Sequence, residues 1–102
     1  MSEKIYSVEE IKAIASPLAR QYGVAALYLF GSYARGEATA QSDLDFLVDR
    51  TGMGDLLALG GLCSDLEESF DKPLDLLTMQ MLSDDFLAAI QPEEVLLYAR
   101  QP

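Results

Sequence analysis

A chain of 102 residues, half of them hydrophobic, is large enough for one compact core, so we expect a single domain over residues 1–102, without a membrane span or signal peptide. The absence of histidine and the single cysteine, Cys63, exclude histidine-based zinc sites, Ser-His or Cys-His nucleophile systems and disulfides, and favour a reducing cytoplasm. A net charge of −10 with only seven Lys and Arg disfavours direct binding of nucleic acid and suits a basic protein partner.

The first predicted element is a helix that begins at Ser7. Ser7 and Glu10 form a capping box, in which each side chain bonds the backbone N–H of the other residue. Apolar residues then recur at helical spacing up to Gly23, which is expected to end the helix. Pro17 removes one hydrogen bond inside this pattern, so we expect it to kink the helix or split it in two.

Two predicted strands follow, separated by a polar loop. Residues 24–30 are almost continuously apolar, which indicates a central strand with both faces buried. The strand ends at Gly31-Ser32, residues 36–42 form the loop, and residues 44–49 form the second strand. We expect Ser42 to shape the turn before that strand.

Asp43 and Asp45 lie one residue apart at the start of the second strand. Residues i and i+2 of a strand share a face, about 6.5–7 Å apart, so the two carboxylates would lie side by side. Their repulsion would be relieved by a hard cation such as Mg²⁺, which binds one or two carboxylates together with substrate phosphates. Taken alone, the acids could also form the polar face of a half-exposed strand.

Gly31 and Ser32 supply the other half of a nucleotide site. Glycine permits close approach of the backbone, Ser32 can cap the short segment 33–35, and N–H groups at a helix start bind anions. Alone, this pair is also an ordinary strand-ending turn. Arg35 could approach a phosphate or pair with Glu37 or another acid, and we favour the ion pair.

The second half of the chain predicts two helices and two strands. Asp55 caps a helix whose apolar stripe includes Cys63, expected to be a core thiol, and whose Gly60-Gly61 pair would allow close packing against the sheet. Residues 74–78 form a third strand. Ser83 caps a last helix that Pro92 ends, and residues 95–98 form a closing strand.

Asp75 is an acid inside the otherwise apolar third strand. Such a residue is usually paired or bound to metal, although on an edge strand it could simply face water. The order helix–strand–strand–helix–strand–helix–strand predicts the α/β class, with a small mixed β-sheet and helices packed against it.

Four residues carry a resemblance to a known family. Gly31, Ser32, Asp43 and Asp45, with ten residues between the two pairs, form the G-S-x10-D-x-D signature of the DNA polymerase β nucleotidyltransferase superfamily. The longer string LFGSYARGEATAQSDLDFLV is similar to the minimal nucleotidyltransferase (MNT) antitoxins encoded beside HEPN-domain ribonuclease toxins. The resemblance extends from about residue 24 to residue 98, and it implies a polymerase-β-like fold.

The resemblance also implies roles for the site residues. Asp43 and Asp45 would bridge two Mg²⁺ ions, and Asp75 would be the third catalytic carboxylate, binding only the catalytic ion. Gly31 and Ser32 would hold the β- and γ-phosphates of ATP. Attack at the α-phosphorus would then transfer AMP to a tyrosine of a cognate HEPN toxin in a hetero-oligomer of the two proteins.

Two other functions stay open at this point. The chain could be a non-catalytic antitoxin that acts by binding the toxin, or a small-molecule nucleotidyltransferase whose acceptor site forms across an oligomer. All three motif acids are present, which favours catalysis. Larger relatives carry a further domain that holds the acceptor, and this chain ends at Pro102 without one. We therefore expect the acceptor surface to belong to another polypeptide.

Overall fold

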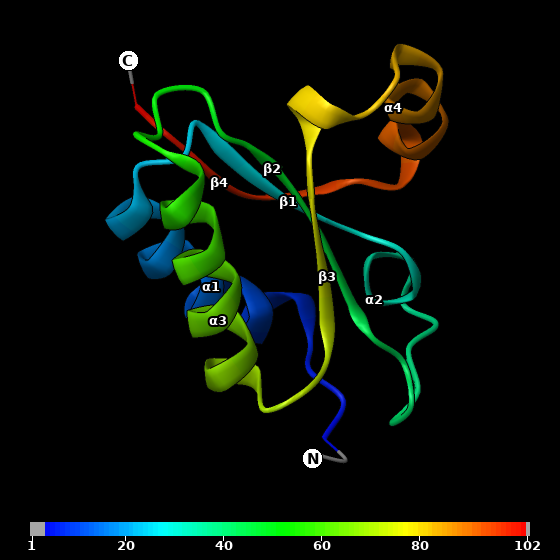
Figure 1. The fold of residues 1–102 in the computed structure, drawn as a ribbon. Coiled ribbons are helices and arrows are strands. Elements are labelled where there is room, and N and C mark those ends of the chain that lie inside the picture. The colour runs from blue at the N-terminus through cyan, green and yellow to red at the C-terminus, as the bar shows by residue number, and fades with distance from the viewer. Residues whose placement is uncertain (1–3, 102) are drawn as a thin grey trace.

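The computed structural model describes residues 4–101 as a four-stranded mixed sheet with helices packed against it (Figure 1). The limits of the predicted domain, residues 1 and 102, lie outside the described residues. The elements in chain order are α1 (Val8–Tyr22), β1 (Ala26–Phe30), α2 (Ser32–Arg35), β2 (Leu44–Asp49), α3 (Leu56–Phe70), β3 (Leu74–Thr78), the 3-10 turn η1 (Met79–Met81), α4 (Asp84–Ile90), the 3-10 turn η2 (Gln91–Glu93) and β4 (Val95–Ala99). The predicted α/β class is confirmed.

The sheet has the strand order β3-β2-β1-β4. β1 is antiparallel to both β2 and β4, whereas β2 and β3 are parallel and are joined through α3. The first predicted strand is therefore central, as expected. It begins two residues later than predicted, and Tyr28 and Phe30 on one of its faces are only partly buried.

Helix α1 begins and ends where its sequence predicts. The Ser7–Glu10 capping box is complete, and Gly23 closes the helix at φ 73°. Of the two outcomes predicted for Pro17, a kink or a split, the split does not occur, because α1 runs unbroken through it. Pro17 faces solvent, while buried residues on both sides of it hold the helix on the sheet, and Ser16 Oγ donates to the Leu97 carbonyl at 2.8 Å.

Helix α3 lies beside α1 and covers the same face of the sheet (Figure 1). A Cβ on Gly61 would lie 3.0 Å from the Tyr22 ring, so glycine allows close packing against α1, whereas the prediction placed the sheet there. The prediction that Cys63 is a core thiol is wrong. Its side chain is only partly buried and lies 3.8 Å from Glu67 Oε1, because the buried stripe of α3 is narrow.

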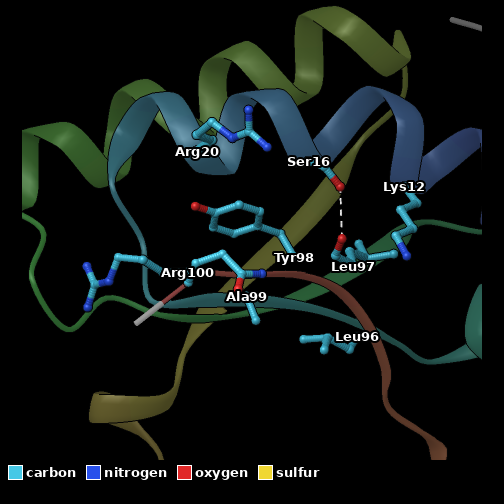
Figure 2. Close-up of a pocket in the computed structure, with 9 residues that line it drawn as sticks. Lys12, Ser16, Arg20, Leu96, Leu97, Tyr98, Ala99 and Arg100 are labelled. Carbon is cyan, nitrogen blue, oxygen red and sulfur yellow. Dashed lines mark hydrogen bonds between the residues drawn. The ribbon is translucent and has the colours of Figure 1, made fainter.

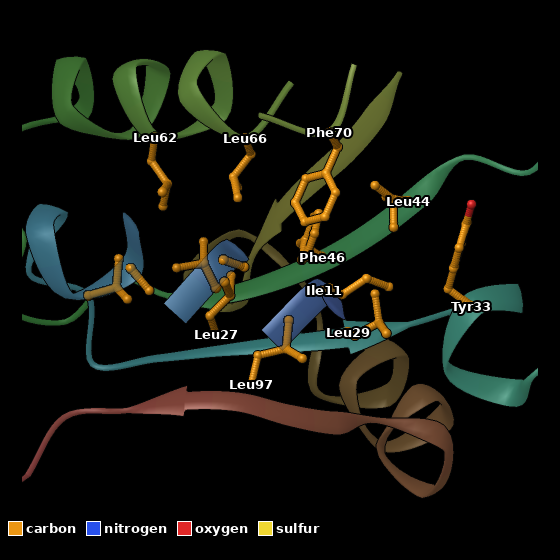
Figure 3. Packing of buried hydrophobic residues seen from close by; sticks show 14 residues of the cluster. Ile11, Leu27, Leu29, Tyr33, Leu44, Phe46, Leu62, Leu66, Phe70 and Leu97 are labelled. Carbon is orange, nitrogen blue, oxygen red and sulfur yellow. The ribbon is translucent and has the colours of Figure 1, made fainter. Parts of the chain in front are cut away.

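The core lies between the sheet and these two helices (Figure 3). Leu62, Leu66 and Phe70 point from α3 toward β2, where Leu44 and Phe46 lie. Because side chains alternate along a strand, the neighbouring residues Asp45, Leu47 and Asp49 face the opposite side of the sheet. Within residues 4–101, no helix is both long and apolar enough to cross a membrane.

Candidate active site

Gly31 lies at the end of β1 and directly faces the Asp45 carboxylate. Its backbone has φ 77° and ψ −157°, a conformation that side chains rarely adopt. A Cβ at this position would overlap Asp45 Oδ2 and lie 3.1 Å from Asp45 Cγ. Glycine is therefore required both by the backbone conformation and by the close approach of the aspartate.

Ser32 is the first residue of helix α2 and does not cap it. Helix α2 spans Ser32–Arg35, and its N-cap is Gly31, without a side-chain capping bond. The prediction that the Ser32 hydroxyl caps this segment is wrong, because the helix begins one residue earlier than that prediction required. The residue stays partly exposed next to Gly31.

Asp45 has the other two motif acids close enough to act on its charge. Asp45 on β2 and Asp75 on β3 are direct partners in the parallel ladder, so both side chains leave the same face of the sheet. Asp43 immediately precedes β2 and is exposed, as is Asp75 on its edge strand, whereas Asp45 is partly buried. Burial, followed by the negative charges of Asp75 and Asp43, raises the pKa of Asp45 to about 6.

The aspartates do not form a closed metal cage. Among the described residues, no three His, Cys, Asp or Glu side chains are gathered into a metal-binding cluster. Mg²⁺ does not need one, because it usually keeps water ligands and binds one or two carboxylates together with substrate phosphates. The pKa of Asp45 is raised by burial first and then by the charges of Asp75 and Asp43, and a bound cation would offset both effects by stabilising the ionised carboxylate. The donor set fits a cation shared with substrate, and the ligand roles stay a prediction.

A fourth acid, Glu93, reaches the glycine turn from η2. Its Oε1 accepts hydrogen bonds from the Gly31 backbone N–H at 3.2 Å and from Arg35 Nη1 at 3.2 Å. Arg35 Nε also donates to Glu37 Oε1 at 2.9 Å, so the favoured ion pair of Arg35 is confirmed. Sequence reasoning missed Glu93, since no local pattern links it to a turn 62 residues away.

The loop that leads to Asp43 is anchored from both ends. Ser42 Oγ accepts from the Thr39 N–H at 2.8 Å, which confirms its predicted role in the turn. Lys72, only 5% exposed, donates from Nζ to the Ala40 carbonyl at 3.2 Å. The segment that follows α3 thereby holds the loop that leads to Asp43.

A groove of about 710 Å³ lies elsewhere, between α1 and β4 (Figure 2). Its lining includes Lys12, Arg20 and Arg100, three of the seven basic residues of the chain. The β4 residues that line the groove pair with Ala26, Leu27 and Tyr28, at the start of β1. Gly31 follows Phe30, at the other end of β1. None of the predicted site residues lines the groove, so it is separate from the carboxylate site.

The geometry of a glycine turn beside paired carboxylates agrees with a comparison of the whole sequence. Residues 9–102 match the polymerase beta nucleotidyltransferase family. The chain belongs to this family. Protein adenylyltransferase MntA of Thermococcus cleftensis is 33% identical to this nucleotidyltransferase over 93 residues, which cover 87% of this chain and 94% of that protein. The chain is thus an enzyme of the nucleotidyl-transfer class.

Solved structures with the same fold include toxin–antitoxin complexes. A crystal structure of a toxin–antitoxin with AMP-PNP superposes with a TM-score of 0.70 at 27% identity, covering 88% of this chain and 73% of that one. The MNT antitoxin in complex with the tri-AMPylated HEPN toxin of Shewanella oneidensis has a TM-score of 0.68 at 22% identity, covering 91% and 73%, which shows the shared fold.

Proposed function

We propose that this nucleotidyltransferase is an antitoxin that transfers AMP from ATP to a tyrosine of a cognate HEPN toxin and thereby neutralises it. In this proposal the 102 residues act as one domain, in the cytoplasm, within a complex of the two proteins. The observation that carries it is the register of Asp45 with Asp75, directly beside Gly31. Two carboxylates next to a glycine turn are the parts that a metal-bound triphosphate needs.

The comparisons support the choice of substrates. A relative at 33% identity is named a protein adenylyltransferase, and a toxin–antitoxin neighbour at 27% identity was crystallised with the ATP analogue AMP-PNP. In the Shewanella oneidensis complex, the partner of the MNT antitoxin is an AMPylated HEPN toxin. By analogy, the acceptor of this chain is a protein hydroxyl.

Each site residue then has a role. Asp43, Asp45 and Asp75 would hold two Mg²⁺ ions, with Asp75 on the side of the acceptor. Bound magnesium supplies neutralisation of the triphosphate charge and lowers the pKa of the attacking hydroxyl. The bare Gly31 backbone lets the β- and γ-phosphates approach, and Ser32 lies at the same turn.

The transfer itself is a displacement at the α-phosphorus of ATP. The tyrosine oxygen forms a new bond to that phosphorus, and the bond from phosphorus to the oxygen bridging to the β-phosphate breaks. Pyrophosphate leaves with that oxygen. The hydroxyl proton passes to solvent water, to which the site is open at the exposed Asp75. The product is a tyrosine carrying AMP.

The test is intact-mass spectrometry of the proposed HEPN partner, to be sought in the reading frame next to this chain, after incubation with the enzyme, ATP and Mg²⁺. The wild type should add adenylyl groups to a tyrosine. Asp75→Asn should slow the addition by about 10²-fold or more, because activation of the attacking hydroxyl contributes about 10²–10⁴-fold to such rates. Asp85→Asn, at an exposed acid on α4, is the matched control and should modify at the normal rate.

The same samples distinguish catalysis from binding. If the wild type adds no mass while the Asp75 variant still silences the toxin, the protein acts by binding alone. If mass appears on a small molecule and never on the partner, the acceptor assignment is wrong.

A further inference from the structure

Two hydrogen-bond donors at the glycine turn converge on one anionic oxygen. The Gly31 N–H and Arg35 Nη1 both donate to Glu93 Oε1, each at 3.2 Å. One donor is a backbone group at the position predicted to bind phosphate, and the other is a permanently charged guanidinium. The Gly31 N–H and Arg35 thus form an anion-binding position, which the Glu93 carboxylate occupies.

Several features of this contact allow another anion to replace Glu93. Charge-assisted hydrogen bonds are usually about 2.7–2.9 Å long, so both bonds to Glu93 are longer than well-formed ones. The Glu93 side chain is 32% exposed and comes from η2, a turn of three residues. Arg35 is held independently, because its Nε donates to Glu37 at 2.9 Å and this bond does not involve Glu93. Loss of Glu93 would therefore leave the guanidinium in place.

We propose that the Gly31 N–H and Arg35 form a phosphate-binding pair of the nucleotide site, and that Glu93 occupies this pair until the triphosphate of ATP displaces it. This inference rests on the proposed function, since it assumes that nucleotide binds at Gly31. A single N–H donates to one strong acceptor at a time, so Glu93 and a phosphate oxygen compete for it. Arg35 exchanges one anion for another and loses no ion pair.

The exchange has two consequences for the protein. The Glu93 carboxylate lowers the affinity for ATP, because its charge must be moved away before a phosphate can bind. Its release also frees η2 from the glycine turn, while Val95 at the start of β4 stays paired with Leu29. Nucleotide binding is thereby linked to the position of η2.

The experiment is calorimetric titration of the full chain with ATP and Mg²⁺. Glu93→Gln keeps a side-chain oxygen for the Gly31 N–H but removes the charge, and Glu93→Ala removes the acceptor. Both variants should bind ATP more tightly, by roughly 3- to 10-fold, the effect of removing one partly exposed like charge. Arg35→Ala should weaken binding by a similar factor.

Glu37→Gln is the matched control. It also removes a carboxylate from Arg35 but leaves the Gly31 N–H occupied by Glu93, and Glu37 is more exposed, so it should raise affinity less than Glu93→Gln does. If Glu93 only holds the turn in shape, Glu93→Ala will weaken ATP binding while Glu93→Gln leaves it unchanged, and that result overturns the inference. Wild-type protein that binds no ATP at all would instead overturn the proposed function.

Discussion

At the scale of single residues, Asp45 bears a conflict between folding and function. The residue is partly buried, faces Gly31 and has two acids as neighbours, and these conditions raise its pKa to about 6. A side chain chosen for stability would carry no charge here. The conflict is understandable if a cation and a triphosphate complete the site, and it can be measured in the metal-free protein.

Asp45→Asn should therefore stabilise the metal-free protein at pH 7. The folded pKa of about 6 lies above the ordinary value of 3.8, so ionised Asp45 destabilises the fold above the folded pKa, and this cost disappears as pH falls to the unfolded pKa. After a discount for solvent screening, we expect a gain of about 1–2 kcal/mol at pH 7 and almost none near pH 4.

Urea unfolding with a chelator at both pH values measures this gain. Asp49→Asn is a contrasting control on the same strand. Burial acts to raise the pKa of Asp49, but its hydrogen bonds with Thr51 and Gln80 outweigh this and lower it. The Asp49 variant should lose stability at pH 7. A less stable Asp45 variant at pH 7 would contradict the electrostatic account.

At the scale of elements, the sequence predicted those features whose signals are local. The caps of α1, α3 and α4 and the strands Leu44–Asp49 and Leu74–Thr78 agree with the prediction, because capping residues and apolar runs act over a few neighbouring positions. The burial of Cys63 and the possible split at Pro17 could not be judged from local signals, because packing against the sheet decides both.

The residues of the candidate site also fall into those with a local signal in the sequence and those that only the fold brings together. The spacing of Gly31, Ser32, Asp43 and Asp45 is visible in the sequence, and Asp75 could be suggested as an acid in an apolar strand. The register that brings Asp75 beside Asp45 is a property of the sheet. Glu93 could not be found at all, because its contact with Gly31 depends on how η2 returns across the fold.

Asp71→Gly should stabilise α3 from its C-terminal end. Asp71 is the C-cap at φ 52°, the one non-glycine residue at positive φ within residues 4–101, and its charge lies at the negative end of the helix dipole. Glycine should add about 1 kcal/mol to the free energy of unfolding, measured in urea. Gly23→Ala, at the equivalent cap of α1, should lose a similar amount. An unchanged or less stable Asp71 variant would contradict this view of the cap.

At the scale of the whole molecule, the topology separates stability from chemistry. The core lies on the face of the sheet covered by α1 and α3, whereas Asp45 and Asp75 leave the opposite face. The antiparallel pair β1–β2 and the parallel pair β2–β3 bring Gly31 and the two aspartates together at one place. Substitutions in the site should therefore alter binding while the core packing stays intact.

The most direct test of the central claim is calorimetric measurement of ATP binding with and without Mg²⁺ to the wild type, Asp45→Asn and Asp49→Asn. The account predicts that the wild type and the Asp49 variant bind ATP only when Mg²⁺ is present. Asp45→Asn should lose at least about 10-fold in affinity, since it removes a charged ligand for the cation beside Gly31. Equal affinity of the wild type and the Asp45 variant, each correctly folded, would show that the nucleotide binds elsewhere.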